Sequence, residues 1–251
     1  GSMDDSRMPF VSVIIPVLDD TKRLAQALAS IGHDPSVEVI VVNAGARTPA
    51  IEGLERLAPQ VRWVASLPGR GRQMNAGASG ATGAWLLFLH ADTRLPAGWL
   101  EELKGIAATR SVGGSFRFQL DSATCWARVI ERGVAARVRW FDLPYGDQAL
   151  FARRDVFAAL GGYRELPVME DVDLVRRLRR VGRLHHSTLP VVTSARRWEA
   201  DGWVRRSAEN VLLVLLFFLG VSPEWLAERY RTSRGPRDSG GRVSEPGAID
   251  E

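Results

Sequence analysis

Residues 10–42 read FVSVIIPVLDDTKRLAQALASIGHDPSVEVIVV, and the fold class can be inferred from this stretch. It opens and closes with short, mostly β-branched apolar runs, 10–15 and 37–42, which are typical of buried strands. Between these runs, residues 24–31 place apolar side chains at the spacing of one helix face. A strand, a helix and a second strand in this order predict a βαβ unit, and therefore a parallel sheet.

The alternation of strands and helices continues through the first half of the chain. Right-handed crossovers place the carboxyl ends of parallel strands at one edge of the sheet, where open α/β sheets bind their ligands. We therefore expect functional residues just after Ile15, Val42, Ala65 and Leu89. Further strands are predicted over residues 61–65 and 84–89, and helices over residues 49–58, 76–82 and 97–108.

The second half of the chain is less regular. Its pattern predicts strands over residues 115–120, 148–151 and 189–193, and helices over residues 123–138, 170–181, 203–219 and 223–230. The two halves together predict an α/β fold with a mixed, mainly parallel sheet flanked by helices, followed by C-terminal helices.

The composition is that of an ordinary globular protein and excludes several functional classes. The 251 residues are 45% hydrophobic and 25% charged, and the single cysteine, Cys125, excludes an intrachain disulfide and a cysteine-rich zinc site. No HExxH pattern is present, so a zinc hydrolase is not expected. The net charge of +4 favours phosphorylated small molecules, nucleic acid or anionic membranes as partners. High-GC codon usage, which raises the arginine content, would produce the same charge.

Asp92 follows the predicted strand 84–89 within the sequence HADT at residues 90–93. A carboxylate at the end of a central strand points into the ligand cleft, where Mg²⁺ is held by one or two carboxylates and the phosphates of a substrate. Capping of the next helix is an equally good interpretation of this aspartate.

A glycine-rich basic segment, GRGRQMNAG at residues 69–77, follows the predicted strand 61–65. Two arginines among glycines, just before a helix, favour a phosphate-binding loop. The segment is neither a Walker loop nor a GxGxxG fingerprint, and a flexible basic loop is the alternative interpretation.

Carboxylates gather at the start of the predicted helix 170–181. Glu170 and Asp171 are adjacent there, and Asp147 follows an irregular segment. One of them is a candidate general base, although acidic residues also stabilise a helix N-terminus without any chemistry. Successive helical residues point about 100° apart, so only one of the adjacent pair can face a given site.

Taken in order, these motifs resemble those of family 2 glycosyltransferases with the GT-A fold. Closer still, LHADT, YGDQALF and RRWE resemble a bacterial subgroup named radical-SAM/selenodomain-associated transferase 2, also labelled arsenosugar-biosynthesis glycosyltransferase. The resemblance covers residues 10–230, and its motifs are VIIP at 13–16, the polar residue after strand 37–42, GRGRQMNAG at 69–77, FLHADT at 88–93, GDQ at 146–148, MED at 169–171 and RRW at 196–198.

The resemblance implies an inverting transfer of sugar from a nucleotide-diphosphate sugar, UDP- or GDP-linked, to a small-molecule or lipid acceptor. It places Asp92 on a divalent cation, Mg²⁺ or Mn²⁺, because the family's DxD motif falls on residues 90–92. The family's catalytic base falls on Asp171, with Glu170 and Asp147 as further candidates. The donor-binding positions that it implies are Pro16, Val17, Leu18, Asp19, Asn43, Ala44, Gly45, Gly69, Arg70, Arg72, Asn75, His90, Ala91, Asp92, Gln148, Arg196, Arg197 and Trp198.

We expect a single domain over residues 10–231, divided by function. On the resemblance, residues 10–110 bind the donor, residues 111–200 bind the acceptor and carry the catalytic groups, and residues 201–231 form C-terminal helices. Residues 1–9 are interpreted as a cloning tag and an N-terminal extension. Residues 232–251, rich in Gly, Ser, Pro and charge, are interpreted as a disordered tail.

Three positions depart from the family's pattern. Asn43 stands where an aspartate is usual, so the charge is missing, although an asparagine can still hydrogen-bond to a pyrimidine. His90 stands at the first acidic position of DxD, and Ser194 at the glutamine of the processive QxxRW pattern. Since long membrane helices are absent as well, we expect transfer of one sugar rather than polymerisation.

Two other functions remain open on the sequence. A nucleotidyltransferase normally has a glycine-rich loop with a lysine directly after strand one, whereas PVLDD stands at residues 16–20. A non-catalytic nucleotide-sugar-binding protein is compatible with Asn43 and His90. Nucleic acid is not an expected partner, because the arginines are not combined with an aromatic stacking platform.

The longest apolar run, residues 211–219, is too short for a transmembrane helix, which needs about 20 residues. Because no signal peptide is recognisable, we expect a cytoplasmic protein. The predicted helix 203–219 either packs on the domain or presents a face to the inner surface of the membrane or to a second copy in a homodimer.

Overall fold

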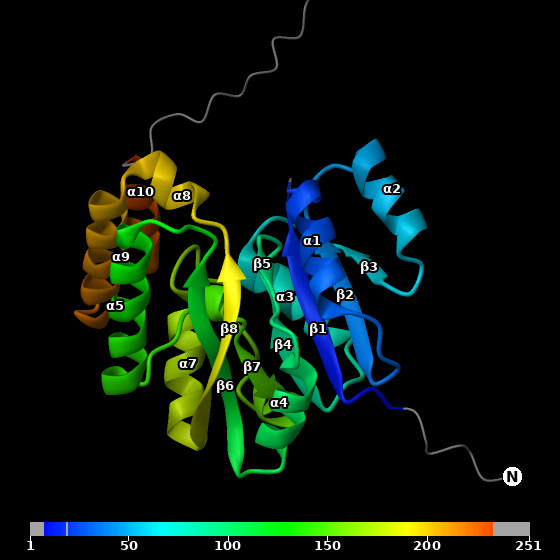
Figure 1. The fold of residues 1–251 in the computed structure, drawn as a ribbon. Helices are drawn as coiled ribbons and strands as arrows, with labels where there is room; N and C mark the ends of the chain where they lie inside the picture. The colour runs from blue at the N-terminus through cyan, green and yellow to red at the C-terminus, as the bar shows by residue number, and fades with distance from the viewer. Residues whose placement is uncertain (1–7, 19, 233–251) are drawn as a thin grey trace, which may run out of the picture.

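The computed structural model describes residues 8–18 and 20–232. Asp19, most of the predicted tag and the predicted tail from residue 233 onward lie outside the described residues. Within them, strands and helices alternate and form a central sheet with helices on both faces (Figure 1).

The described strands form one eight-stranded sheet in the order β3-β2-β1-β4-β7-β6-β8-β5. Neighbouring strands are parallel except that β7 runs antiparallel to β4 and β6, and β5 antiparallel to β8. The predicted mixed, mainly parallel sheet is thereby confirmed. The strands are β1 (Val11–Val17), β2 (Val37–Asn43), β3 (Arg62–Ala65), β4 (Trp85–Phe88), β5 (Thr93–Arg94), β6 (Ser111–Leu120), β7 (Phe151–Arg153) and β8 (Arg183–Thr193).

Helices cover both faces of this sheet because its central strands are apolar on both sides. On one face, Ile15 of β1 packs in a core with Leu24, and on the other face Ile14 packs with Met74 and Leu174. The helices are α1 (Thr21–Ile31), α2 (Pro49–Leu57), α3 (Arg70–Ser79), α4 (Trp99–Ala107), α5 (Cys125–Phe141), α6 (Arg154–Ala159), α7 (Glu170–Val181), α8 (Arg196–Asp201), α9 (Trp203–Phe218) and α10 (Pro223–Thr232), with a 3₁₀ turn η1 (Gly146–Gln148).

The glycine-rich segment 69–77 is helical, which corrects the prediction of a loop followed by a helix from residue 76. Helix α3 begins at Arg70, and Gly69 precedes it with φ of 137°, a conformation that favours glycine. The other glycines allow close packing: a Cβ at Gly77 would lie 2.5 Å from Cγ2 of Ile14, and one at Gly71 would lie 2.9 Å from the carbonyl oxygen of Arg164. Glycine therefore brings α3 close to the sheet here rather than making a flexible loop.

Other differences concern short elements and element ends. The predicted strand 148–151 is the turn η1 followed by β7, and β8 begins at Arg183 rather than at residue 189. The sequence pattern missed β5, α6 and α8, each six residues or fewer. Elements this short depend on tertiary contacts, because one or two turns of helix are unstable alone.

Helices α5, α9 and α10 stand together at the end of the molecule beside β6 and β8, far from α2 and β3 (Figure 1). Helix α10 extends to Thr232, one residue beyond the predicted end of the domain. Among the helices of the described part, none has the length and apolar character needed to cross a membrane.

Candidate active site

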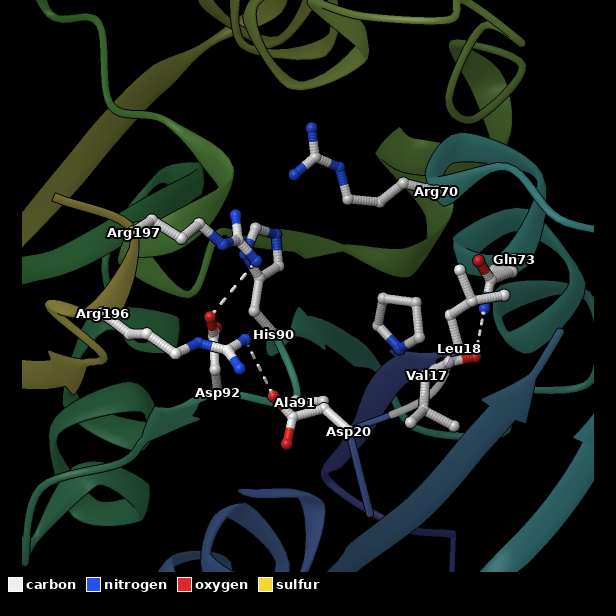
Figure 2. Close-up of a pocket in the computed structure, with 11 residues that line it drawn as sticks. Val17, Leu18, Asp20, Arg70, Gln73, His90, Ala91, Asp92, Arg196 and Arg197 are labelled. Atoms are coloured by element: carbon white, nitrogen blue, oxygen red, sulfur yellow. Dashed lines mark hydrogen bonds and ion pairs between the residues drawn. The ribbon is translucent and has the colours of Figure 1, made fainter. Parts of the chain in front are cut away.

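A polar cavity of about 390 Å³ opens at the carboxyl ends of β1 and β4. Strand β1 has β2 on one side and β4 on the other, so the cavity lies at a switch point of the sheet, the usual ligand position in open α/β folds. Its walls come from the end of β1, α3, the segment after β4 and α8 (Figure 2). The lining residues are Pro16, Val17, Leu18, Asp20, Arg70, Gln73, His90, Ala91, Asp92, Arg196 and Arg197.

Arginines and carboxylates pair around this cavity. Nη2 of Arg197 lies 3.3 Å from Oδ2 of Asp92, and Nη2 of Arg196 lies 3.6 Å from Oδ2 of Asp20 (Figure 2). Arg70, in the first turn of α3, pairs through Nε with the buried carboxylate of Glu170. A guanidinium group has five N–H donors, so each arginine can hold its carboxylate and also bind an oxygen of an anionic ligand.

Two lining residues, Asp20 and Gln73, were not predicted as donor-binding residues. Asp20 caps α1, because its side chain accepts a hydrogen bond from the backbone N–H of Arg23 at 3.4 Å. The Nε2 group of Gln73 donates to the carbonyl oxygens of Val17 and Val42, both at 2.9 Å, and so ties the ends of β1 and β2 to α3. Helical spacing would have indicated Gln73, since position 73 is three residues after Arg70 and shares its face.

The candidate base lies beside the cavity, at the start of α7. Oδ2 of Asp171 accepts a hydrogen bond from the backbone N–H of Gly146 at 2.7 Å. A Cβ at Gly146 would lie 3.1 Å from Nε2 of His90 and 3.2 Å from Oδ2 of Asp171, so glycine lets these two side chains approach. The sequence motifs at residues 90–92, 146–148 and 169–171 therefore meet at one point, which we call the reaction centre (His90, Gly146, Asp147 and Asp171).

Burial and neighbouring charges shift two ionisable groups at the reaction centre. Burial lowers the pKa of His90 to about 3, and the positive charges of Arg70 and Arg197 act in the same direction, so the imidazole is neutral. Burial raises the pKa of Asp147 to about 6, against the opposing effect of Arg137. One oxygen of Asp147, Oδ1, is buried without a hydrogen-bond partner among the described residues, which makes this carboxylate the less well stabilised of the acidic groups.

The backbone is constrained on both sides of these carboxylates. Met169, directly before Glu170, has φ of 65°, and Ala149, just after η1, has φ of 48°. Non-glycine residues in this left-handed region cost free energy and are concentrated at functional sites. The turn at Met169 sets the direction in which α7 begins.

Several predicted donor-binding residues lie away from the cavity lining. Arg72 pairs with Glu165 on the exposed surface, with Nη2 and Oε2 2.7 Å apart. Asn75 binds the backbone of Tyr163 with both ends of its amide. The other predicted residues outside the lining are Asn43, whose Oδ1 accepts from the N–H of Gly45, then Ala44, Gly45 and the helix cap Gly69, and the buried Gln148 and Trp198.

Asp173 lies two residues after Asp171 in α7, and its side chain is buried. It accepts hydrogen bonds from Arg177 at 2.8 Å and from Arg164 at 3.2 Å. Asp173 thus forms ion pairs with Arg164 and Arg177. Because residues two apart in a helix point about 200° apart, its side chain is turned away from that of Asp171 and from the reaction centre.

The cavity offers a divalent cation a limited set of protein ligands. Within residues 8–18 and 20–232, no three His, Cys, Asp or Glu side chains gather closely enough to hold a metal by themselves. Asp92 provides a carboxylate in the cavity lining, and the neutral imidazole of His90 provides a nitrogen. This set fits a Mg²⁺ or Mn²⁺ ion that takes one carboxylate from the protein and most other ligands from phosphate and water.

Solved structures share this fold at low sequence identity. S. aureus TarS 1-349 superposes with a TM-score of 0.58 and 15% identity over 74% of this chain and 60% of that one, and the same protein is known in complex with UDP-GlcNAc. Glucosyl-3-phosphoglycerate synthase from Mycobacterium tuberculosis, in complex with Mn²⁺, UDP and glucosyl-3-phosphoglycerate, superposes with a TM-score of 0.57 and 17% identity over 85% and 81% of the two chains. The chain thus spans less than two thirds of the TarS fragment, and likeness at this identity concerns the fold alone.

The family assignment comes from the sequence. No curated protein matches the chain. The family model described as glycosyl transferase family 2 matches residues 12–161, a range that runs from β1 through α6 and includes the cavity ends of β1 and β4 together with η1. With more than half of its length matched and a GT-A fold around its polar cavity, the chain belongs to glycosyl transferase family 2.

Proposed function

We propose that the protein transfers one sugar from a nucleotide-diphosphate sugar to a hydroxyl group of a small-molecule or lipid acceptor, with inversion at the anomeric carbon. The observation that carries this proposal is the polar cavity in which Arg70, Arg196 and Arg197 converge beside Asp92. We expect a uridine nucleotide, because TarS and glucosyl-3-phosphoglycerate synthase are both known in complex with UDP. On its motifs, the chain is further proposed to belong to the selenodomain-associated subgroup.

The arginines have a clear role in such a transfer. As the bond between the anomeric carbon and the diphosphate oxygen breaks, the electron pair leaves with the diphosphate and negative charge grows on it. Arg70, Arg196 and Arg197 line the cavity and can donate charge-assisted hydrogen bonds to that charge. Their carboxylate partners hold the guanidinium groups in place beforehand, so little reorganisation is needed when the charge develops.

The acceptor oxygen forms its new bond to the anomeric carbon from the opposite face, and its proton passes to a carboxylate. We assign this role to Asp171, which the family resemblance selects and which the Gly146 amide holds beside His90. Glu170 is committed to Arg70 and acts as a positioning residue for that arginine. Asp147 lies next to Gly146, and we assign to it the binding of the acceptor's hydroxyl group.

A divalent cation would be held by Asp92, with phosphate oxygens of the donor as further ligands. When bound, it supplies positive charge that offsets the charge of the diphosphate. Arg197 already shares Asp92, so the same carboxylate connects the cation position to an arginine of α8.

A thermal-shift panel tests the proposal. UDP, GDP, CDP and ADP, and the UDP-sugars, are each added with and without Mn²⁺. A nucleotide at about one hundred times its dissociation constant adds about 2.7 kcal/mol to the free energy of unfolding, which raises the Tm of a domain of this size by roughly 5–10 °C. We expect the largest shift with a UDP-sugar and Mn²⁺. A panel in which no nucleotide diphosphate shifts the Tm would contradict the proposal.

A hydrolysis assay with the best-binding nucleotide-sugar separates an enzyme from a non-catalytic binding protein. Weak hydrolysis of the donor, with water as the acceptor, is common among transferases. The nucleotide-sugar that gives the largest shift is therefore incubated with the protein, and release of the nucleotide diphosphate is followed. Binding without any hydrolysis, in the wild type as in Asp171→Asn, would favour a non-catalytic binding protein.

A further inference from the structure

A second cavity, of about 790 Å³, lies between α5 and α9, and its chemistry is opposite to that of the first. Its volume lies in the range of about 300–1,000 Å³ that is typical of pockets enclosing most of a small molecule. Apolar side chains from both helices supply most of the lining: Val129, Ile130 and Val134 from α5, and Val211, Val214 and Leu215 from α9.

This cavity adjoins the reaction centre through Asp147. The Asp147 side chain lines the cavity, and the preceding residue, Gly146, donates its backbone N–H to Asp171. The negative charges of Asp171 and Asp92 act on Asp147, so it lies within electrostatic reach of the polar cavity. Turn η1 therefore contributes Asp147 to the apolar cavity and lies, through Gly146, beside His90 of the polar cavity.

Three polar atoms in the apolar lining have no hydrogen-bond partner among the described residues. Oδ1 of Asp147, Nε1 of Trp198 and Oγ of Ser207 are buried and find no hydrogen-bond partner among the residues that the structure describes. The Trp198 side chain is 8% exposed. A buried polar atom without a partner costs about 1–3 kcal/mol, so such atoms in a cavity wall indicate a ligand with a few hydrogen-bonding groups. A hydroxyl group can donate to a carboxylate and accept from an indole N–H or a serine hydroxyl.

The rim of the cavity carries large apolar side chains that remain exposed to solvent. Trp140 and Phe141, at the end of α5, are 73% and 63% exposed, and Leu215 and Phe218, on α9, are 56% and 46% exposed. Contiguous apolar surface at a cavity mouth is costly in water and is typical of sites for apolar ligands. A ligand longer than the cavity would continue along this rim.

The cavity wall is anchored to the sheet. Asp142, directly after α5, accepts hydrogen bonds from Nε2 of His186 on β8 at 2.5 Å and pairs with Nε of Arg179 on α7 at 3.2 Å. Nδ1 of His186 is in turn 2.9 Å from Oγ of Ser115 on β6. These contacts hold the C-terminal end of α5, one wall of the cavity, against the sheet and α7.

We infer that the cavity between α5 and α9 binds the aliphatic chain of a lipid-type alcohol and presents its hydroxyl group, through Asp147, to the reaction centre. This inference rests on the proposed function and names the acceptor class. A free sugar carries hydroxyl groups over its whole surface and would need many polar partners, whereas this lining has few. The charged groups in the lining, Arg137, Arg179 and Asp147, suit a polar head at one part of an otherwise apolar molecule.

The test uses the purified full chain and a photoreactive probe, a twelve-carbon primary alcohol that carries a diazirine in its chain. After irradiation, labelled peptides are identified by mass spectrometry. We expect labelling within residues 125–141 and 203–218, the ranges of α5 and α9. Gly133→Leu should lower this labelling at least fivefold, because Gly133 lines the cavity and a Cβ there meets nothing within 4 Å. The new side chain enters open space and replaces a helical glycine, so the fold should be retained.

Matched controls separate filling of the cavity from general effects. Gly105→Leu in α4 makes the same change at another open helical glycine outside the cavity and should label as the wild type does. Val129→Asp should also reduce labelling, and Val181→Asp should not, although both valines are 53% exposed.

UDP binding is measured on the same samples, so that the two proposals can fail separately. Labelling that falls elsewhere, or that Gly133→Leu leaves unchanged, overturns the inference even where UDP binds. Absence of UDP binding with labelling retained in α5 and α9 contradicts the proposed function instead. A dimer seen by light scattering that Gly133→Leu dissociates would make a second copy the occupant, and this also overturns the inference.

Discussion

Glu170 and Asp171 are neighbours in the sequence but differ in what they contact. The buried carboxylate of Glu170 pairs with Arg70, while Asp171 faces the Gly146 amide and His90. The rotation of about 100° between successive helical residues produces this division. Substitutions at the two positions should therefore affect different steps of the reaction.

Asp171→Asn should lower turnover by about 10²- to 10⁴-fold and leave UDP affinity nearly unchanged, because a general base acts in the chemical step. Transfer rate and UDP affinity are measured together. Glu170→Gln should instead weaken UDP binding, because Arg70 loses a charged partner in a buried position. Turnover above about a tenth of the wild-type value in Asp171→Asn would move the role of base to another carboxylate.

Asp147→Asn should stabilise the protein at neutral pH. Its pKa of about 6 in the folded protein lies above the ordinary value of 3.8, so the folded state binds more protons than the unfolded state between about pH 4 and 6. Stability due to this group is lost as pH rises through that window, and an asparagine does not ionise. The variant should gain about 1–3 kcal/mol at pH 7 and almost nothing below pH 4, as measured by urea unfolding. An equal gain in the free energy of unfolding at pH 7 and below pH 4 would contradict a raised pKa of Asp147.

Helix α3 connects the sheet to the polar cavity, where we propose that the donor binds. It lies so close to β1 and β2 that a Cβ at Gly77 would lie 2.5 Å from Cγ2 of Ile14 and 3.0 Å from Cγ2 of Val42. Its first turn carries Arg70 and Gln73 into the cavity. The close packing of α3 on the sheet therefore determines where the side chains of Arg70 and Gln73 lie in the cavity.

Gly77→Ala should destabilise the protein by about 1–3 kcal/mol, since an added methyl group in a tightly packed interface forces the helix outward. Urea unfolding at pH 7 measures the change. Gly105→Ala in α4 is the control, because a Cβ there meets nothing within 4 Å. That substitution should stabilise by about 0.5–1 kcal/mol through helix propensity. Stabilisation by both substitutions would show that α3 is not held by close packing at Gly77.

The long elements could be predicted because their apolar patterns are local. Both faces of β1 are buried, so its continuous apolar run was sufficient to indicate a central strand. The glycines of α3 were ambiguous, because the reason for Gly71 is the backbone of Arg164, far along the chain. The prediction of a loop also led to the prediction that Arg72 binds the donor. In a loop both arginines can reach one phosphate, but in a helix Arg70 and Arg72 point about 200° apart.

The molecule has a polar cavity at the carboxyl ends of β1 and β4 and an apolar cavity between α5 and α9, whose lining includes Asp147 of η1. The rim of the apolar cavity and the net charge of +4 together favour contact with an anionic membrane, from which a lipid-type acceptor would enter. This prediction concerns peripheral contact only, because no helix among the described residues is long and apolar enough to cross a membrane.

The protein should sediment with anionic lipid vesicles at low salt and less at high salt, because screening weakens the attraction. Replacing Trp140 and Phe141 together by serine should reduce the bound fraction at least threefold, while UDP binding stays intact. Both side chains are exposed, so the fold should tolerate the change. Absence of binding at low salt would exclude the membrane as the source of the acceptor.

We propose that the polar cavity binds the diphosphate of the donor, and calorimetric titration of UDP in the presence of Mn²⁺ measures this binding. Arg197 lines the cavity, whereas Arg72 pairs with Glu165 on the surface, so the two arginines make a matched pair. Arg197→Ala should weaken UDP binding about 10- to 100-fold, the effect of losing a charge-assisted hydrogen bond, and Arg72→Ala should leave it unchanged. Equal affinity in the wild type and Arg197→Ala, or an equal loss in both variants, would contradict the claim.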